Sequence, residues 1–188
     1  KLLELYNSSD VYEIAAEEIF DDKSKRKQAK RLFLSYAYGM KRQHILAAAQ
    51  GFGADRQNAK KFFEQFKTFE AWKVLVQEEF HRTGRIGTAL GNYMHRDRKV
   101  ELTSKEKRSA ISQVVQGTAS LIFKKALLCL SSISEVKLKL PMHDAVLLEH
   151  SADYDIDRVI NIFSEIMSEH FQNKIQGKAS LSQFHEDR

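Results

Sequence analysis

The sequence predicts a mostly helical α/β chain, of the α+β type, in which a small antiparallel sheet forms late. Apolar residues recur with the 3.6-residue period of a helix through most of residues 10–82. Apolar and lysine side chains alternate, as they do along a half-exposed strand, between Val136 and Met142. A single proline in 188 residues agrees with a chain that is rich in helix.

Capping residues mark where several of the helices begin. Asp10, with Glu13 three residues later, begins the first, and Thr103 with Glu106 forms a capping box for a longer one. The expected helices are Val11–Phe20, Lys23–Tyr36, Lys41–Gln50, Asp55–Phe66, Glu70–Arg82, Thr103–Leu130 and Asp155–Phe171.

Turn-forming glycines and alternating residues predict the strands. Three glycines between residues 84 and 91 punctuate a short segment that predicts a hairpin. The alternating segment that begins near Glu135 is expected to pair with Val146–Glu149, and Lys178–Gln183 is expected to form a final strand. There is no internal repeat and no Pro- or Gly-rich linker, so one folded unit is expected.

The composition limits the class of protein. Hydrophobic residues make up 43% of the chain, which is enough for a sizeable core, and no apolar run reaches the length of a membrane span, so no membrane partner is expected. The single cysteine, Cys129, excludes an internal disulfide and a cysteine zinc site and fits a reducing compartment. The first residues have neither signal-peptide form nor an initiator methionine, so a processed or trimmed chain is expected.

The charge is basic and unevenly spread. The net charge is +5, and six lysines and arginines crowd the stretch from Lys23 to Arg31. Such a cluster favours an anionic partner such as a phosphate backbone. A solvated lysine-rich surface would give the same composition, so composition alone does not distinguish a phosphate-binding surface from a solvated one.

One helical stripe has the chemistry of a polyphosphate site. Residues four apart lie nearly above one another on a helix, so Arg26, Lys30, Leu34 and Tyr38 form a slowly turning stripe. An arginine fork and a lysine one turn apart can grip phosphates, and an aromatic ring can stack on a base. Gly39 then permits close approach of another backbone or of nucleic acid. The alternative is a solvated basic helix that ends in a glycine cap.

A second candidate site lies at the turn of the late hairpin. His143 and Asp144 stand between the two alternating segments, where a carboxylate is held on strands yet open to a ligand. Transfer of a phosphoryl group with two metals needs carboxylates that hold Mg²⁺ against phosphate oxygens. The alternative is an ordinary polar turn.

The order and spacing of these motifs resemble the family A DNA polymerases over nearly the whole chain. The fingers helix of that family is resembled by R-x3-K-x7-Y-G, which begins at Arg26. The family's last palm motif is resembled by P-M-H-D-A-V-L-L-E, and its primer-template helix is resembled by Q-G-T-A. The resemblance implies triphosphate contacts for Arg26 and Lys30, and a primer-template role for Tyr38 and Gly39. It also implies that Asp144 is a Mg²⁺ ligand and that His143 lies near the primer end.

Further roles follow from the same resemblance, with departures. Gln116 matches a residue that reaches the minor groove of the primer-template, and Ser112 replaces the usual asparagine beside it. Leu34 replaces an aromatic residue beside the sugar of the incoming nucleotide, which affects sugar selectivity. Tyr12 stands where the family often has a phosphate-binding histidine. Ala145 replaces an auxiliary glutamate, which implies slower or metal-sensitive chemistry.

The resemblance also implies the organisation of the molecule. Residues 1–102 would form a fingers-like helical region and residues 103–188 the C-terminal palm portion of a right-hand polymerase fold. The palm motif that supplies the second metal aspartate is not in the sequence, so the chain alone is expected to be inactive. It would need an N-terminal portion with the thumb, that motif and an exonuclease-like region, either as a split gene product or as the rest of a cleaved chain.

The expected function is template-directed DNA synthesis from dNTPs, with Mg²⁺ as cofactor, in the cytoplasm of a bacterium or of a virus-infected host cell. The departures look more viral or phage-like than cellular. Single-subunit RNA polymerases share the fingers motif and a His-Asp pair followed by a small residue, but Q-G-T-A argues against them. A degenerate, inactive module that only binds primer-template is the other alternative.

Overall fold

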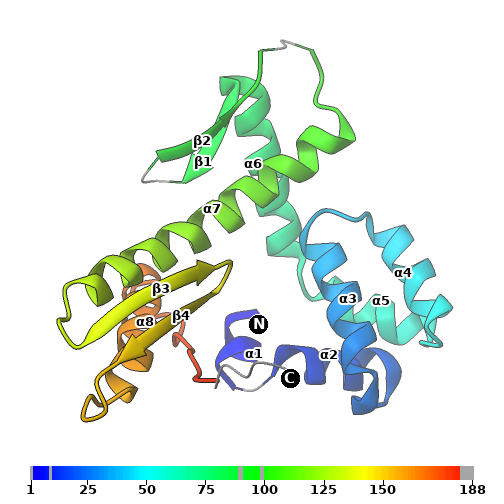
Figure 1. The fold of residues 1–188 in the computed structure, drawn as a ribbon. Helices are drawn as coiled ribbons and strands as arrows, with labels where there is room; N and C mark the ends of the chain where they lie inside the picture. Colours follow the sequence, from blue (N-terminus) through cyan, green and yellow to red (C-terminus); the bar gives the residue numbers. More distant parts are fainter. Residues whose placement is uncertain (1, 9, 89–90, 98–99, 183–188) are drawn as a thin grey trace, which may run out of the picture. The chain divides into compact units, whose positions relative to one another are not determined.

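The structure is a computed structural model that describes residues 2–8, 10–88, 91–97 and 100–182. Its internal contacts divide it into two compact units, residues 1–117 and 118–188, and each is described by itself. Helices dominate, and the described residues also form two antiparallel hairpins (Figure 1). The division of function between residues 1–102 and 103–188 stays a prediction.

The first unit begins with a group of packed helices (Figure 1). They are α1 (Leu2–Ser8), α2 (Val11–Phe20), the 3₁₀ turn η1 (Lys23–Lys25), α3 (Arg26–Ala37), α4 (Arg42–Gly51) and α5 (Arg56–Glu64). The start of the predicted helix at Lys23 is therefore a 3₁₀ turn, because the Asp22 side chain accepts a hydrogen bond from Ser24 N and caps it there.

The core of this helical group is aromatic. α3 buries Ala29, Leu32 and Tyr36 and leaves its basic stripe outside, as its amphipathic pattern predicts. Phe62 and Phe63 of α5 are also fully buried, and the Tyr36 and Phe63 rings lie 4.9 Å apart, centroid to centroid. This close contact between two tilted rings holds α3 in place relative to α5.

The rest of the first unit surrounds a second, smaller core. It contains α6 (Lys67–Thr83), β1 (Arg85–Thr88), β2 (Gly91–His95) and the N-terminal half of α7, a helix that runs through residues 104–131. β1 and β2 pair antiparallel, which confirms the hairpin predicted from the glycines. The buried residues of this core are Val76, Phe80, Ile86, Leu102, Ala110 and Ile111.

The second unit is a hairpin packed against helices. It contains the rest of α7, β3 (Val136–Met142), β4 (Ala145–His150) and α8 (Asp157–His170). β3 pairs antiparallel with β4, with an irregularity between Leu138 and Leu140. Leu130 from α7 and Val159 from α8 are buried beside Leu138 on one face of the hairpin. The strand periodicity that predicted this hairpin is therefore confirmed.

Three regions differ from the sequence-based expectation. α1 lies where no element was predicted, and α6 begins at Lys67, three residues before the predicted Glu70. The final strand predicted over Lys178–Gln183 is wrong for residues 178–182, which are irregular, while Gln183 lies outside the described residues. Leu181 is 58% exposed, so its side chain has little of the packing that stabilises a strand.

α7 is long and apolar enough, by length and composition alone, to cross a membrane. Only 17% of its most apolar window is buried in this structure, and Leu128 is 71% exposed. A single such helix is weak evidence, because apolar helices that pack in soluble domains meet the same criterion. The expectation of no membrane partner stays a prediction.

Candidate nucleotide-binding site

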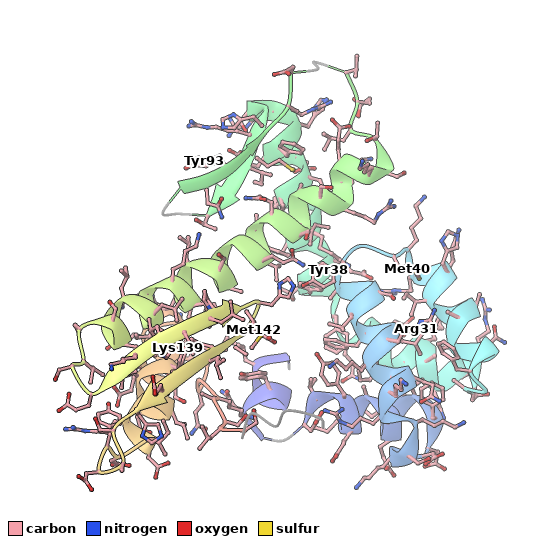
Figure 2. All side chains as sticks on the ribbon, in the orientation of Figure 1. Arg31, Tyr38, Met40, Tyr93, Lys139 and Met142 are labelled. Carbon is pink, nitrogen blue, oxygen red and sulfur yellow. The ribbon has the colours of Figure 1, made fainter. Side chains whose placement is uncertain are left out.

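The basic stripe of α3 is open to solvent at its N-terminal end. Arg26 and Lys30 are exposed, whereas Leu34 and Tyr38 are partly buried. Tyr38 lies at the C-terminal end of the helix, and its N–H donates to the carbonyl of Leu34 (Figure 2). The predicted phosphate-binding cations therefore lie at one end of the stripe and the predicted stacking ring at the other.

Tyr12 brings the first turn of α2 to this stripe. The Arg26 guanidinium lies 5.5 Å from the centroid of the Tyr12 ring, and the Lys30 ammonium lies 5.3 Å from it. Phe33 packs edge-on against the same ring, at 6.1 Å between centroids. Cation–π attraction at these distances gathers both cations around one phenol. The structure thus brings Tyr12, predicted from one motif, next to Arg26 and Lys30, predicted from another.

The pKa values of this cluster reflect its charges. Burial raises the pKa of the Tyr12 phenol, nearby Asp10 and the Tyr38 phenol add to the rise, and Arg26 opposes it. Tyr12 therefore stays a neutral hydrogen-bond donor at physiological pH.

Asp10 connects α2 to Arg26. Its Oδ1 accepts hydrogen bonds from Tyr12 N (2.8 Å) and Glu13 N (3.3 Å), so it caps α2 as predicted. Its Oδ2 accepts from Arg26 Nε (3.0 Å) and Nη2 (2.5 Å). Burial alone would raise the pKa of Asp10, but the hydrogen bonds from Arg26 and the backbone lower it overall.

The C-terminal end of α3 is tied to α4 and α6. The Tyr36 hydroxyl donates to Glu70 Oε1 at 3.0 Å, and Arg42 Nη2 donates to Glu70 Oε2 at 2.7 Å. Lys73 is buried, donates to the Tyr36 carbonyl at 3.0 Å and lies 4.1 Å from the centroid of its ring. These contacts hold the helix turn that precedes Tyr38.

The ionisation of Tyr36 gives a test of this anchoring. Burial, and then the hydrogen bond to Glu70, raise the pKa of Tyr36 well above its ordinary value of 10.0. Above pH 10 the unfolded chain loses this proton while the folded chain keeps it, so the free energy of unfolding falls as pH rises. The expected contribution is at most about 1.4 kcal/mol per pH unit. Urea unfolding between pH 9 and 11 should show a shallower decline in Tyr36→Phe, and an unchanged slope would contradict this.

The predicted primer-template residues of α7 lie beside a buried glycine. Ser112 and Gln116 lie one turn apart, so they share a face of the helix, and Gln116 is exposed. Gly117 is buried against the β1–β2 hairpin, where an added Cβ would lie 3.0 Å from Thr88 Cγ2. Gln113 Nε2 donates to the Asn92 carbonyl at 2.6 Å. The close approach that requires glycine at residue 117 is therefore made by the β1–β2 hairpin.

Gly117→Ala is expected to destabilise the first unit by about 1 kcal/mol. Alanine gains about 1 kcal/mol of helix propensity, but overpacking typically costs about 1–3 kcal/mol. Thr88 is buried and its hydroxyl donates to the Gly91 carbonyl at 2.6 Å, so it yields little. Thr88→Ser removes the offending methyl group. In urea unfolding the double variant should therefore be less destabilised than the two single effects sum to, and strict additivity would contradict the contact.

A close approach by α7 also explains why residue 39 is a glycine. Its φ is +99°, a left-handed conformation that favours glycine. An added Cβ would lie 3.3 Å from Arg108 Cγ and 3.6 Å from Ile111 Cδ1, both on α7. The glycine therefore lets the end of α3 approach α7, within the first unit.

His143 and Asp144 form the two-residue turn between β3 and β4, in the second unit. Met142 pairs with Ala145, so the turn is tight, and both side chains are exposed. Among the described residues, no group of three or more His, Cys, Asp or Glu side chains gathers to hold a metal ion. Asp144 therefore offers one accessible carboxylate, which fits part of a Mg²⁺ site.

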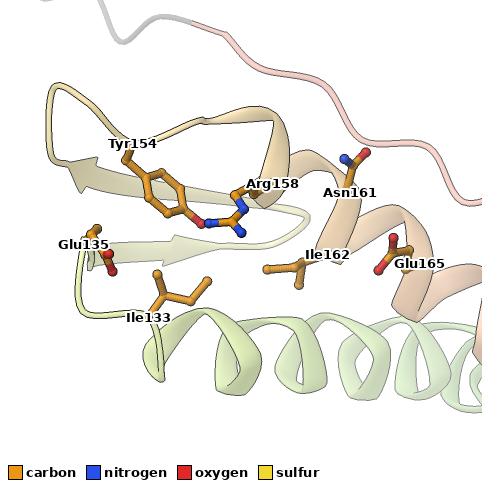
Figure 3. Close-up of a pocket in the computed structure, with 7 residues that line it drawn as sticks. All are labelled: Ile133, Glu135, Tyr154, Arg158, Asn161, Ile162 and Glu165. Atoms are coloured by element: carbon orange, nitrogen blue, oxygen red, sulfur yellow. The ribbon is translucent and has the colours of Figure 1, made fainter.

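The pocket in Figure 3 lies elsewhere in the second unit. Its volume is about 470 Å³, and its lining residues are Ile133, Glu135, Tyr154, Arg158, Asn161, Ile162 and Glu165. The lining includes two carboxylates and one guanidinium, so it has no excess of positive charge for a phosphate. None of the predicted site residues line it.

Sequence reasoning missed the contacts that organise the site. Asp10 was predicted only as a helix cap, and Lys73 and Glu70 were not predicted to have a role. Asp10 lies 16 residues before Arg26, a spacing with no local periodicity. Its only sequence signal is that a capping carboxylate has a second oxygen free to accept.

The chain is similar in sequence to known DNA polymerases. The chain is 27% identical to DNA polymerase I of Bacillus subtilis over 172 residues, and 27% identical to that of Geobacillus stearothermophilus over 177. These matches cover 84% and 85% of this chain but only 19% of each relative.

The fold matches the POL domain of Pol1 from M. smegmatis, solved in complex with DNA primer-template and dNTP. The TM-score is 0.71 at 19% identity, covering 94% of this chain and 34% of that one. This likeness confirms the predicted fold class. The model of DNA polymerase family A matches residues 1–183, nearly the whole length, and the chain therefore belongs to DNA polymerase family A.

Proposed function

We propose that this chain is the fingers and C-terminal palm portion of a DNA-directed DNA polymerase. The reaction is attack of a primer 3′-hydroxyl on the α-phosphate of a dNTP. A new phosphodiester bond forms, the bond between the α- and β-phosphates breaks, and pyrophosphate leaves with its negative charge. The cluster of Tyr12, Arg26 and Lys30 is the observation that carries this proposal.

The residues of the first unit bind and orient the incoming nucleotide. Arg26 and Lys30 contact the triphosphate and stabilise the charge that accumulates on the leaving pyrophosphate. Tyr12 donates its hydroxyl to a phosphate oxygen. Leu34 borders the sugar, and Tyr38 stacks at the template side. Arg26 and Lys30 are exposed at the N-terminal end of the α3 stripe, which leaves room for a phosphate group there.

The residues of the second unit serve the reacting centre. Asp144 would hold Mg²⁺, which in this chemistry neutralises charge on the phosphate oxygens. His143 contacts the primer end. Two metal ions need a further carboxylate, so we propose that another part of the polymerase supplies it, and that these 188 residues alone do not extend a primer.

The exposed apolar side chains of the second unit support such a partner. Leu140 and Met142 on β3 are 52% and 45% exposed, and Leu128 on α7 is 71% exposed. Apolar surface of this kind gains stability when another surface covers it. The N-terminal polymerase portion, with the thumb and the first palm motif, is the partner that the family implies.

Primer extension tests the proposal. The chain alone and the complete polymerase are given a DNA primer-template and Mg²⁺, with dNTPs in one series and rNTPs in another. The complete polymerase is expected to extend the primer with dNTPs, and the chain alone is not. A preference for rNTPs would show that the protein is an RNA polymerase. Binding of primer-template without extension would show that it is an inactive binding module.

A further inference from the structure

Asp10 uses both carboxylate oxygens, one on the start of α2 and one on Arg26. We propose that Asp10 is a positioning residue that aims Arg26 and Tyr12 together at the incoming triphosphate. The inference rests on the proposed function, because it assigns a task within the same site. It goes beyond the capping role that the sequence predicts.

The geometry of the contact favours positioning. Oδ1 is fixed by the backbone N–H groups of Tyr12 and Glu13, so the carboxylate cannot rotate freely. Oδ2 then takes Nε and Nη2 of Arg26 and fixes the plane of the guanidinium. A guanidinium has five N–H donors. The three that Oδ2 does not take, two on Nη1 and one on Nη2, face away from the carboxylate.

The site remains open despite this ion pair. The Arg26 side chain is 44% exposed and that of Asp10 is 34% exposed. Asp10 caps the helix that carries Tyr12, and the Tyr12 ring lies beside both Arg26 and Lys30. One carboxylate thus orients two of the three groups that would contact the phosphates, which lowers the entropy lost on binding.

The alternative role for Asp10 predicts the opposite sign. A carboxylate beside an anion site repels the anion, and if Asp10 only competed with the triphosphate for Arg26, removing it would tighten binding. If Asp10 positions Arg26, removing it weakens binding although the site becomes more positive. The direction of the change therefore separates the two roles.

The test measures dNTP binding by the complete polymerase on a primer-template, together with kcat and KM. Asp10→Ala is expected to raise the dissociation constant and KM about tenfold, with a smaller effect on kcat. Asp10→Asn keeps one oxygen, which can still cap α2, but its amide nitrogen is a donor and cannot accept from Arg26, so this variant should weaken binding nearly as much as Asp10→Ala. Tighter binding by either variant would overturn the inference.

Two controls separate positioning from loss of a helix cap. Asp55 caps α5 through Gln57 N and Asn58 N in the same way but forms no ion pair with an arginine of the described part of the chain, so Asp55→Ala should change dNTP binding less than about twofold. In an Arg26→Ala background, Asp10→Ala should have a smaller effect, because only its contact with the start of α2 at Tyr12 remains to be lost. An undiminished effect there would show that Asp10 acts only through the cap, and would overturn the inference.

The outcome is distinguishable from failure of the proposed function. If the unaltered polymerase neither binds nor uses dNTPs, the proposed function fails. If it binds dNTPs and Asp10→Ala binds them more tightly, the function stands and only the positioning role of Asp10 is wrong.

Discussion

Asp144→Asn in the complete polymerase is expected to slow DNA synthesis by about 10³-fold or more. Asparagine keeps the shape of the side chain but removes the negative charge that would hold Mg²⁺. Losing a single group that stabilises a transition-state charge costs about 10²–10³-fold, and losing a metal ligand affects both the metal and the charge it neutralises. Single-turnover extension with saturating dNTP measures the chemical step directly.

The Asp144→Asn variant is expected to fold and to bind its ligands. Asp144 is exposed in the β3–β4 turn, so the substitution leaves the packed face of the hairpin intact. Primer-template and dNTP affinity should therefore change less than the rate. Asp153→Asn removes the same charge from another exposed position of the second unit and should leave the rate unchanged. Near-normal synthesis by Asp144→Asn would remove Asp144 from the reacting centre.

Lys30→Ala is expected to lower kcat/KM for dNTPs by about 10²-fold, the second-largest effect. The Lys30 ammonium lies beside Tyr12 and one helical turn from Arg26, so its loss leaves a single cation for the triphosphate. Alanine is the best helix former, so α3 itself should stay intact. Cations that clamp a transferring phosphoryl group contribute effects of this order.

Steady-state kinetics with a charge-matched control tests this expectation. Lys61→Ala removes an exposed lysine from α5 in the same unit and should leave kcat/KM within about twofold, because surface charges away from a site contribute little. Affinity for primer-template at fixed salt should be similar in both variants. A loss that appeared in DNA affinity and not in dNTP use would assign Lys30 to the template backbone instead.

Local patterns predicted most of the secondary structure. The capping residues Asp10 and Thr103 stand at helix starts, and the Asp55 carboxylate caps α5. Strand alternation predicted β3 and β4 because every second residue faces the same side. The failed strand at residues 178–182 has the same alternation, and alternation alone does not supply packing for its side chains.

The candidate site was predicted residue by residue but not as a cluster. The stripe Arg26, Lys30, Leu34 and Tyr38 follows from helical spacing, so sequence alone placed it on one face. The approach of Tyr12 to that stripe required α2 to pack on α3. Spacing along one helix carries no information about a neighbouring helix, so only the fold brought Tyr12 there.

The sequence by itself determined the helices, the hairpins, the phosphate-binding stripe and the resemblance to the family. These depend on interactions between residues near each other in the chain, and on motifs whose order is read directly. The tertiary structure decided that Asp10 holds Arg26, that Lys73 anchors the turn before Tyr38, and that Gly117 makes room for Thr88. Each of these joins residues at least 16 positions apart, and only the packing of buried side chains brings such residues together.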